Sequence, residues 1–154
     1  MTEIERRKAE HLALAAGEGV ESLAGPGWDD VHLVHDALPA TDAADVDLST
    51  SFLGRTLRLP LFVSGMTGGH DRASAVNAVL AAAAERWSLA LGVGSQRAAL
   101  RDPSLVPTYA IARESAPTAF LIANVGISQL VAQDGELALG GDDIRRIIDM
   151  VRAD

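Results

Sequence analysis

Three apolar runs recur along the chain at nearly equal intervals, and a short polar motif follows each of them. The runs cover residues 61–64, 89–93 and 119–123, and polar residues do not alternate with apolar ones within them. Parallel strands that are covered on both faces have this pattern. The polar motifs recur about every 30 residues, the length of a strand, a helix and the two loops that join them.

Helices are predicted between and after these runs. Residues 72–87, 104–115 and 142–152 are each predicted to be helical. The apolar stripe that we expect the first of these helices to bury consists of Val76, Val79, Leu80, Ala83, Ala84 and Trp87. Asp142 is the expected N-cap of the last helix. The alternation of strands and helices predicts an α/β fold with three parallel inner strands.

The first third of the chain has a different pattern. Residues 3–16 lack Gly and Pro and are rich in Ala, Leu, Glu and Arg, which predicts a helix. Glycines and a Gly-Pro-Gly sequence predict a loop over 17–30, and a short strand is expected at 31–36. Residues 40–51 are acidic and turn-like, and residues 52–60 predict a tight turn that leads into the first inner strand.

Composition narrows the class of protein. The chain of 154 residues has an ordinary globular composition, and its length favours a single domain. Its net charge of −8 and its lack of a basic stripe argue against a nucleic-acid partner. No apolar stretch approaches the roughly 18 residues that span a bilayer, and the charged first residues do not resemble a signal peptide. We therefore expect no membrane partner. The absence of cysteine fits a reducing compartment, so we expect a cytoplasmic protein.

The polar motifs are candidates for a binding site. They are Gly65-Met66-Thr67-Gly68-Gly69, Gly94-Ser95-Gln96-Arg97 and Asn124. Ligands of repeated βα folds bind at the carboxyl ends of the strands, so we expect the motifs to converge there. Glycine backbone admits a flat ring or a phosphate, an arginine suits phosphate oxygens, and a buried amide needs hydrogen-bond partners. The alternatives are an ordinary Gly-rich turn, a surface Arg with a capping Ser, and a turn Asn.

Cationic side chains gather near the start of the chain. Arg7, Lys8 and His11 share one face of the first predicted helix and together could grip a polyanion. From the residues alone, a solvated charged face is the favoured interpretation. We predict no metal site, because His32, His35 and His70 are not spaced along the sequence as metal ligands are.

The motifs occur together, in this order, in one known family. They are Arg7-Lys8-Ala9-Glu10-His11-Leu12, Phe52-Leu53-Gly54, Gly65-Met66-Thr67-Gly68-Gly69, Gly92-Val93-Gly94-Ser95-Gln96-Arg97 and Asn124-Val125-Gly126. On these motifs the chain resembles the N-terminal portion of type 2 isopentenyl diphosphate isomerase, an FMN-dependent (β/α)8 TIM-barrel enzyme. The resemblance covers essentially the whole chain. It implies about three βα units of a barrel over 52–154, preceded by an N-terminal helical arm and lead-in over 1–51.

The resemblance also implies roles for individual residues. It implies that the substrate is contacted by Arg7, Lys8, His11, Ser95, Gln96 and Arg97. It implies that FMN is contacted by Gly65, Met66, Thr67, Ser95 and Asn124. The implied reaction interconverts isopentenyl and dimethylallyl diphosphate in isoprenoid biosynthesis, with reduced FMN, Mg²⁺, and NADPH as reductant. The implied complete enzyme is a homo-oligomer, and the chain offers no candidate catalytic residue or metal ligand.

The resemblance leaves other interpretations open. Three βα units cannot close a barrel, so we expect the chain to be part of a longer protein. By itself we expect it to bind FMN poorly, to associate with copies of itself and to lack isomerase activity. The family's Mg²⁺-binding Glu and a later flavin-contacting Lys have no counterpart in these 154 residues. The alternatives are another FMN barrel, such as a hydroxy-acid oxidase or a dehydrogenase, and a non-catalytic binding or interaction remnant.

Overall fold

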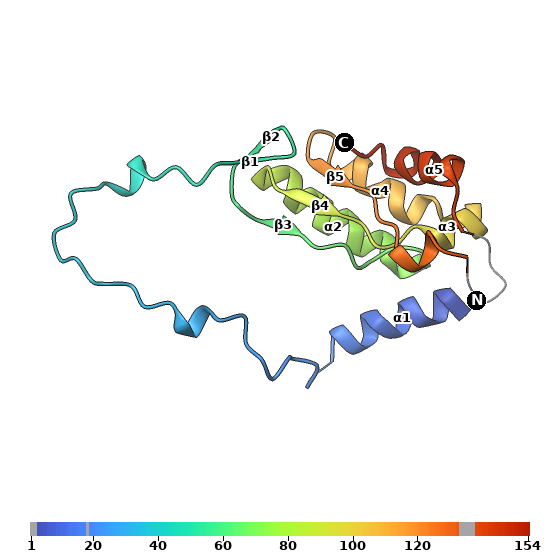
Figure 1. The fold of residues 1–154 in the computed structure, drawn as a ribbon, viewed down its shortest axis with the longest axis horizontal. Helices are drawn as coiled ribbons and strands as arrows, with labels where there is room; N and C mark the ends of the chain where they lie inside the picture. Colours follow the sequence, from blue (N-terminus) through green and yellow to red (C-terminus); the bar gives the residue numbers. More distant parts are fainter. Residues whose placement is uncertain (1–2, 18, 133–137) are drawn as a thin grey trace.

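The chain folds into a body of helices and strands with a long extended segment attached to it (Figure 1). The computed structural model describes residues 3–17, 19–132 and 138–154. Helix α1 (Glu3–Ala15) opens the chain and confirms the first predicted helix. In the part of the chain that the structure describes, no helix is long and apolar enough to cross a membrane.

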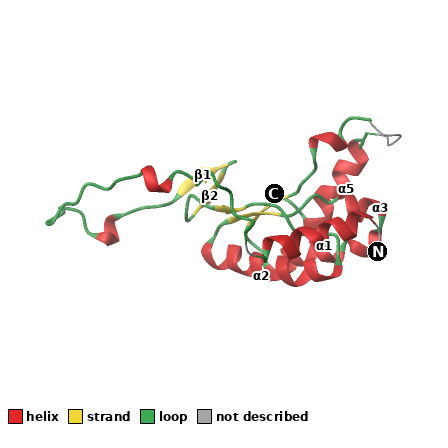
Figure 2. Cartoon of the chain, turned by 90° about the horizontal axis from the view of Figure 1, so that it is seen from below, coloured by secondary structure: helices red, strands yellow, loops and turns green. Residues whose placement is uncertain are grey.

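The extended segment, residues 19–49, runs away from the body and returns to it (Figures 1 and 2). It contains the short 3-10 turns η1 (Trp28–Asp30) and η2 (Ala43–Asp45). The strand predicted at 31–36 is wrong, because these residues pair with no other strand. Leu33 is 91% exposed. Cross-strand pairs stabilise a strand, so an alternating sequence without a neighbouring strand remains a loop.

A hairpin leads from this segment into the body. Strands β1 (Thr50–Phe52) and β2 (Arg55–Leu57) pair antiparallel around Leu53 and Gly54, whose φ angles are 47° and 80°. A two-residue turn with positive φ at both positions matches the twist of the strands that it joins. The hairpin confirms the tight turn predicted over 52–60.

A three-stranded parallel sheet lies at the centre of the body. Its strands are β3 (Phe62–Val63), β4 (Ala90–Gly92) and β5 (Phe120–Ile122), in that order across the sheet. Both pairings are parallel, which confirms the sequence prediction, although each strand is shorter than predicted. The observed architecture is thus α/β with two small sheets, and the closed barrel stays a prediction.

Helices pack against the sheet and enclose the core. Helix α2 (Asp71–Trp87) connects β3 to β4, α4 (Pro107–Ser115) precedes β5, and α5 (Gly141–Val151) follows β5 (Figure 1). The helices predicted at 72–87 and 142–152 are confirmed to within one residue at each end. The core includes the buried side chains Ala81, Ala84, Leu91, Val93, Tyr109, Ala112, Leu121 and Val151.

The apolar stripe predicted on helix α2 is buried only in part: Ala84 is buried and Leu80 packs against the core. Val79 and Trp87 belong to that stripe, yet they are 70% and 47% exposed. The buried residues of the helix are Ala73, Asn77, Ala81 and Ala84. Small side chains on the buried face let α2 and α4 pack closely, and the bulky Val79 and Trp87 lie mostly outside the core.

The helix predicted over 104–115 begins at Pro107, and two short helical pieces precede it. Arg97–Arg101 form α3, Pro103–Leu105 form the 3-10 turn η3, and α4 begins at Pro107. The predicted helix thus corresponds to the end of η3 and to α4, whereas the sequence pattern does not predict α3. Proline lacks a backbone N–H and fits the first turn of a helix, which explains why α4 begins at Pro107.

The start of α5 also differs from the prediction. Its N-cap is Gly140 rather than Asp142, which lies in the first turn of the helix. The Asp143 carboxylate accepts a hydrogen bond from the Gly140 N–H at 3.1 Å. The Asp143 carboxylate, rather than that of Asp142, thus accepts from a backbone N–H at the start of the helix. The Asp142 side chain instead pairs with Arg145 at 2.5 Å.

Candidate functional site

The carboxyl ends of β3, β4 and β5 bring the three polar motifs together. The Gly94 N–H donates to the Thr67 carbonyl oxygen at 2.8 Å, which joins the first motif to the second. The Gln96 N–H donates to the Asn124 carbonyl oxygen at 3.2 Å, which joins the second motif to the third. Parallel strands have their carboxyl ends at one edge of the sheet, so loops distant in sequence become neighbours.

Two glycines of these motifs are required by contacts within the protein. A Cβ on Gly65 would overlap the Val93 carbonyl oxygen and lie 2.9 Å from Nδ2 of Asn124. A Cβ on Gly94 would lie 2.6 Å from the Met66 carbonyl oxygen. From the sequence alone, the glycines of the first motif are expected to admit a ligand. At Gly65, the neighbouring strand-end loops already lie so close to the backbone that they leave no room for a Cβ atom.

Tyr109 of α4 occupies the space beside the next two glycines. Gly68 and Gly69 have φ angles of 141° and 78°, a region that favours glycine. A Cβ on Gly68 would overlap the Tyr109 ring, and one on Gly69 would lie 2.6 Å from its hydroxyl oxygen. Tyr109 is fully buried, and its hydroxyl donates to the Ser95 carbonyl oxygen at 2.8 Å. This side chain supports two motifs at once, a role that the sequence analysis missed.

Helix α1 reaches the site through Lys8, the single lysine of the sequence. Its ammonium nitrogen donates to the Ser95 carbonyl oxygen and to the Tyr109 hydroxyl oxygen, each at 2.8 Å. It also lies 5.3 Å from the centre of the Tyr109 ring, within range of a cation–π interaction. An ammonium group has three N–H donors, so one of them remains for a ligand.

Positive charge is concentrated around Lys8. Burial, together with the charges of Arg7 and Arg97, lowers the pKa of Lys8 from 10.5 to about 8. Lys8 is therefore mostly protonated at neutral pH, and a bound anion would strengthen that state. A shallow pocket beside it is lined by Lys8, His11, Leu12, Met66, Thr67, Gly68 and His70. Cations from α1 and from the second motif thus share one side of the site.

The predicted polar residues differ in how far their side chains are available. Gln96 is fully buried; its amide donates to the Ile147 carbonyl oxygen at 2.6 Å and accepts from the Asn124 N–H at 3.1 Å. The Ser95 hydroxyl oxygen accepts from the Gln129 amide at 2.9 Å. Asn124 is half-buried, and among the described residues its side-chain amide has no hydrogen-bond partner. Gln96 therefore joins β5 to α5, whereas the amide of Asn124 offers a donor and an acceptor.

A buried amide on α2 holds Thr67 in place. The side-chain amide of Asn77 donates to the Thr108 carbonyl oxygen at 2.7 Å and to the Thr67 carbonyl oxygen at 3.4 Å. The Thr67 hydroxyl donates to the amide oxygen of Asn77, and the Gly69 N–H donates to the Thr108 hydroxyl oxygen at 2.9 Å. The sequence analysis missed this role. An amide within an Ala-rich helix was the available signal, because a buried amide needs partners.

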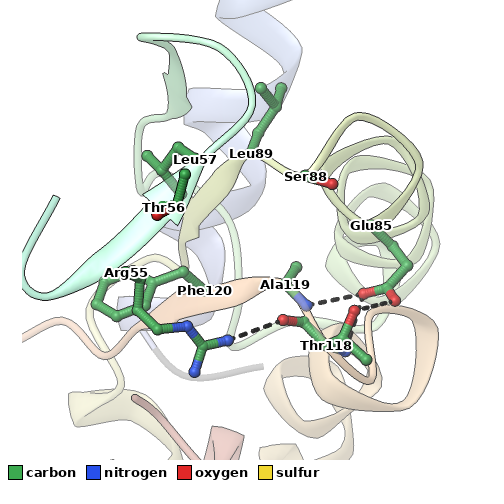
Figure 3. Close-up of a pocket in the computed structure, with 9 residues that line it drawn as sticks. All are labelled: Arg55, Thr56, Leu57, Glu85, Ser88, Leu89, Thr118, Ala119 and Phe120. Carbon is green, nitrogen blue, oxygen red and sulfur yellow. Dashed lines mark hydrogen bonds between the residues drawn. The ribbon is translucent and has the colours of Figure 1, made fainter. Parts of the chain in front are cut away.

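A second pocket lies at the amino end of the sheet (Figure 3). Its charged side chains form hydrogen bonds within the protein. The Glu85 carboxylate accepts from the Thr118 and Ala119 N–H groups at 2.9 and 2.8 Å, and from the Thr118 hydroxyl at 2.6 Å. The Arg55 guanidinium donates to the Thr118 carbonyl oxygen at 3.2 Å. These groups bind neighbouring backbone, so the carboxyl end of the sheet is the stronger candidate for a ligand.

The remaining groups of interest at the carboxyl end are an amide and a thioether side chain. Among the described residues, no three His, Asp or Glu side chains are grouped so that they could hold a metal, so none is assigned to Mg²⁺. The Asn124 amide is available to the edge of a heteroaromatic ring and lies against Gly65. Met66 follows Gly65, is 65% exposed and lines the pocket beside Lys8, where it offers a flexible apolar side chain.

Comparison with known proteins identifies named relatives. A protein of Methanoregula boonei is 56% identical over 124 residues, which cover 80% of this chain and 34% of the relative. A protein of Methanosarcina barkeri is 44% identical over 150 residues, or 97% of this chain and 40% of the relative. A protein of Thermoplasma acidophilum is 43% identical over 151 residues, or 98% of this chain and 42% of the relative. All three are named isopentenyl-diphosphate delta-isomerase.

The chain is similar to isopentenyl-diphosphate delta-isomerases. It spans about two fifths of the length of the curated relatives that it matches. No family model matches the chain. The names of the relatives agree with the reaction implied by the motif resemblance, and they do not state a cofactor.

Proposed function

We propose that this chain forms part of an isopentenyl-diphosphate delta-isomerase of the type 2, FMN-dependent class. The observation that carries the proposal is the contact of Lys8 with the strand-end loop at Ser95, in a chain whose relatives bear the name of this isomerase. A diphosphate needs cations and N–H donors, and a flat cofactor needs open backbone and an amide near by. Both sets of groups occur at one edge of the sheet.

The cationic side of the site binds the diphosphate of the substrate. Arg7, Lys8 and Arg97 supply its positive charge, and His11 adds a hydrogen-bond donor. The chain carries a net charge of −8, so this group of cations contrasts with the rest of the surface and favours an anion there. Ser95 offers a hydroxyl to the substrate, and Gln96 holds Asn124 and α5 in position through its buried amide.

The strand-end motifs hold the flavin. Its contacts are Gly65, Met66, Thr67, Ser95 and Asn124. When bound, reduced FMN supplies the proton transfer that interconverts isopentenyl and dimethylallyl diphosphate. Asn77 and Thr108 keep the Thr67 loop in place for this ring. Mg²⁺, and NADPH as reductant, complete the proposed set of cofactors.

The described βα units form part of a TIM barrel in the proposed arrangement. Residues 52–154 supply about three of its units, and residues 1–51 supply the arm that carries Lys8. The complete protein is a cytoplasmic homo-oligomer in this proposal. The chain's span of about two fifths of its relatives supports a longer protein as the active species.

An isomerase assay of the complete protein that carries this sequence tests the proposal. Isopentenyl diphosphate, Mg²⁺ and NADPH are supplied with and without FMN, and dimethylallyl diphosphate is measured as product. We expect turnover that requires FMN. Turnover without FMN would contradict the type 2 assignment, and oxidation of a 2-hydroxy acid without isomerisation would favour a different flavin barrel.

Two further measurements sharpen this test. Arg7→Ala is expected to weaken substrate binding by about ten- to a hundredfold, the effect of losing one charge-assisted contact. Arg6→Ala is the matched control on α1, because Arg6 pairs with Glu10 at 3.4 Å on an exposed face.

The 154-residue chain by itself is expected to retain little FMN and to show no turnover. Stoichiometric FMN with turnover in that chain would disprove the partial-barrel interpretation.

A further inference from the structure

Tyr109 is fully buried, yet it contacts helix α1 and two of the strand-end loops. We infer that Tyr109 is a positioning residue for the substrate diphosphate: its hydroxyl holds the Lys8 ammonium against the Ser95 carbonyl, so that the remaining N–H of Lys8 is directed to the pocket. This inference rests on the proposed function. The sequence motifs do not include Tyr109, and no ligand contact is assigned to it.

Three polar groups form a closed hydrogen-bonded triangle. The Lys8 ammonium donates to both the Tyr109 hydroxyl and the Ser95 carbonyl, and the Tyr109 hydroxyl donates to the same carbonyl, each at 2.8 Å. The single proton of the tyrosine is used on Ser95, so its oxygen is left to accept from Lys8. Two of the three ammonium donors are therefore fixed, and rotation about the last bond of Lys8 is restricted.

The surroundings of Tyr109 keep this triangle in one arrangement. The ring lies where a Cβ on Gly68 would be, and the hydroxyl oxygen lies 2.6 Å from the position of a Cβ on Gly69. Ala98 of α3 lies beside the same glycine, at 2.8 Å from that position. Burial raises the pKa of Tyr109 well above its ordinary value of 10, so the phenol stays neutral at physiological pH.

The triangle also joins α1 to the body of the protein. Lys8 and Tyr109 lie 101 positions apart in the sequence. Arg7 and His11 share a face of α1 with Lys8, so the attachment of Lys8 positions these neighbouring cations as well. Loss of the Tyr109 hydroxyl is therefore expected to loosen α1 and to weaken anion binding together, without a direct effect on the flavin contacts.

The test uses Tyr109→Phe in the complete protein, which removes the hydroxyl and keeps the ring. Amide hydrogen exchange of α1 reports the attachment, and titration calorimetry with inorganic diphosphate reports anion binding. We expect α1 to exchange about tenfold faster and diphosphate to bind about tenfold more weakly, the effect of one lost hydrogen bond to a charged group. FMN retention, and kcat with isopentenyl diphosphate, are expected to stay within about twofold, whereas KM rises.

Two other variants separate positioning from general damage. Lys8→Met is expected to have the same two effects, and Tyr109→Phe added to Lys8→Met is expected to cause no further loss, because both act through one contact. Arg6→Gln, on the same helix, removes only an exposed ion pair and serves as the control. If Tyr109→Phe does not fold, Tyr109→Met takes its place, because methionine also lacks the hydroxyl and its flexible apolar side chain fills much of the space of the ring.

Unchanged α1 exchange and diphosphate affinity in Tyr109→Phe, or in Tyr109→Met where that variant is used instead, would overturn the inference. Fully additive losses in the double variant would do so as well, because independent effects indicate separate roles. Failure of the proposed function gives a different result. In that case the unmodified protein does not isomerise isopentenyl diphosphate, while hydrogen exchange of α1 still reports whether the Lys8–Tyr109 contact exists.

Discussion

The two ends of the parallel sheet contain similar charged and polar side chains, and they use them in opposite ways. At the amino end, Glu85 and Arg113 direct their hydrogen bonds to nearby backbone and side chains. At the carboxyl end, Lys8 retains one N–H donor, and the amide of Asn124 has no partner among the described residues. The first end is built for stability, and the second has groups available for a ligand.

The amino end illustrates how completely polar groups can be satisfied. The Arg113 guanidinium is buried and donates to the Ala116, Ala119 and Arg152 carbonyl oxygens at 3.2, 3.0 and 2.8 Å. It also pairs with the Asp154 carboxylate at 2.6 Å. Partial burial works to raise the pKa of Asp154, but the hydrogen bond from the Leu121 N–H and the charge of Arg113 outweigh it and lower that pKa.

The largest effect on stability is expected from Arg113→Met, which removes the hydrogen bonds that Arg113 makes at the amino end of the sheet. Removing this guanidinium takes a hydrogen bond from the Ala116, Ala119 and Arg152 carbonyl oxygens. It also takes from the Asp154 carboxylate its shortest ion pair, so the free energy of unfolding should fall by about 3 kcal/mol. Urea denaturation of the variant and the unmodified protein measures the difference. Arg145→Met is the control, since Arg145 pairs with an exposed Asp142; a change of at most about 0.5 kcal/mol is expected. Equal losses in the two variants would contradict the comparison.

Glu85→Ala should have a smaller effect at the same end, about 1–2 kcal/mol of unfolding free energy. The hydrogen bond from the Thr118 hydroxyl, opposed by partial burial, lowers the pKa of Glu85 from 4.5. The stabilisation by Glu85 is therefore fully present above pH 4.5 and is lost as pH falls through the folded pKa. Urea denaturation at a series of acidic pH values should show a shallower decline in the variant, and parallel curves would argue against this role.

Asn124→Ala tests the carboxyl end. Its amide has no partner among the described residues, so the free energy of unfolding should change by at most about 0.5 kcal/mol. Retention of FMN by the complete protein should fall by about tenfold, because one or two hydrogen bonds to the flavin are lost. Gel filtration followed by absorbance of the retained flavin measures this. A loss of stability without loss of flavin would give Asn124 the same role as the residues of the amino end.

The smallest expected effect is a pH dependence of anion binding through Lys8. Its pKa of about 8 means that the ammonium charge is present below pH 8 and is lost as pH rises through that value. Affinity for inorganic diphosphate should therefore fall a few-fold, roughly 1 kcal/mol, between pH 7 and pH 9. Lys8→Met controls for titration of diphosphate itself. The same pH profile in both proteins would show that Lys8 does not contribute its charge.

The strands and the long helices were predictable because their signals are local. The apolar runs before Gly65, Gly94 and Asn124 identify the strands, and helical periodicity predicted α2 and α5 to within one residue. The failures have non-local causes. Residues 31–36 lack a partner strand, and the close approach of α4 to α2 buries Ala73, Asn77 and Ala81 beside only part of the predicted apolar stripe.

By itself, the sequence determined that the three strands run parallel and that the polar motifs lie together at their carboxyl ends. It also indicated Arg7, Lys8 and His11 as cations on one face, although their ligand stays a prediction. Only the tertiary structure decided which polar groups are already bonded within the protein. Gln96 is buried in such bonds, Asn124 is not, and Lys8 is held by a tyrosine 101 positions away. A hydrogen bond depends on distance and direction between atoms, which sequence spacing specifies only within one helix or one turn.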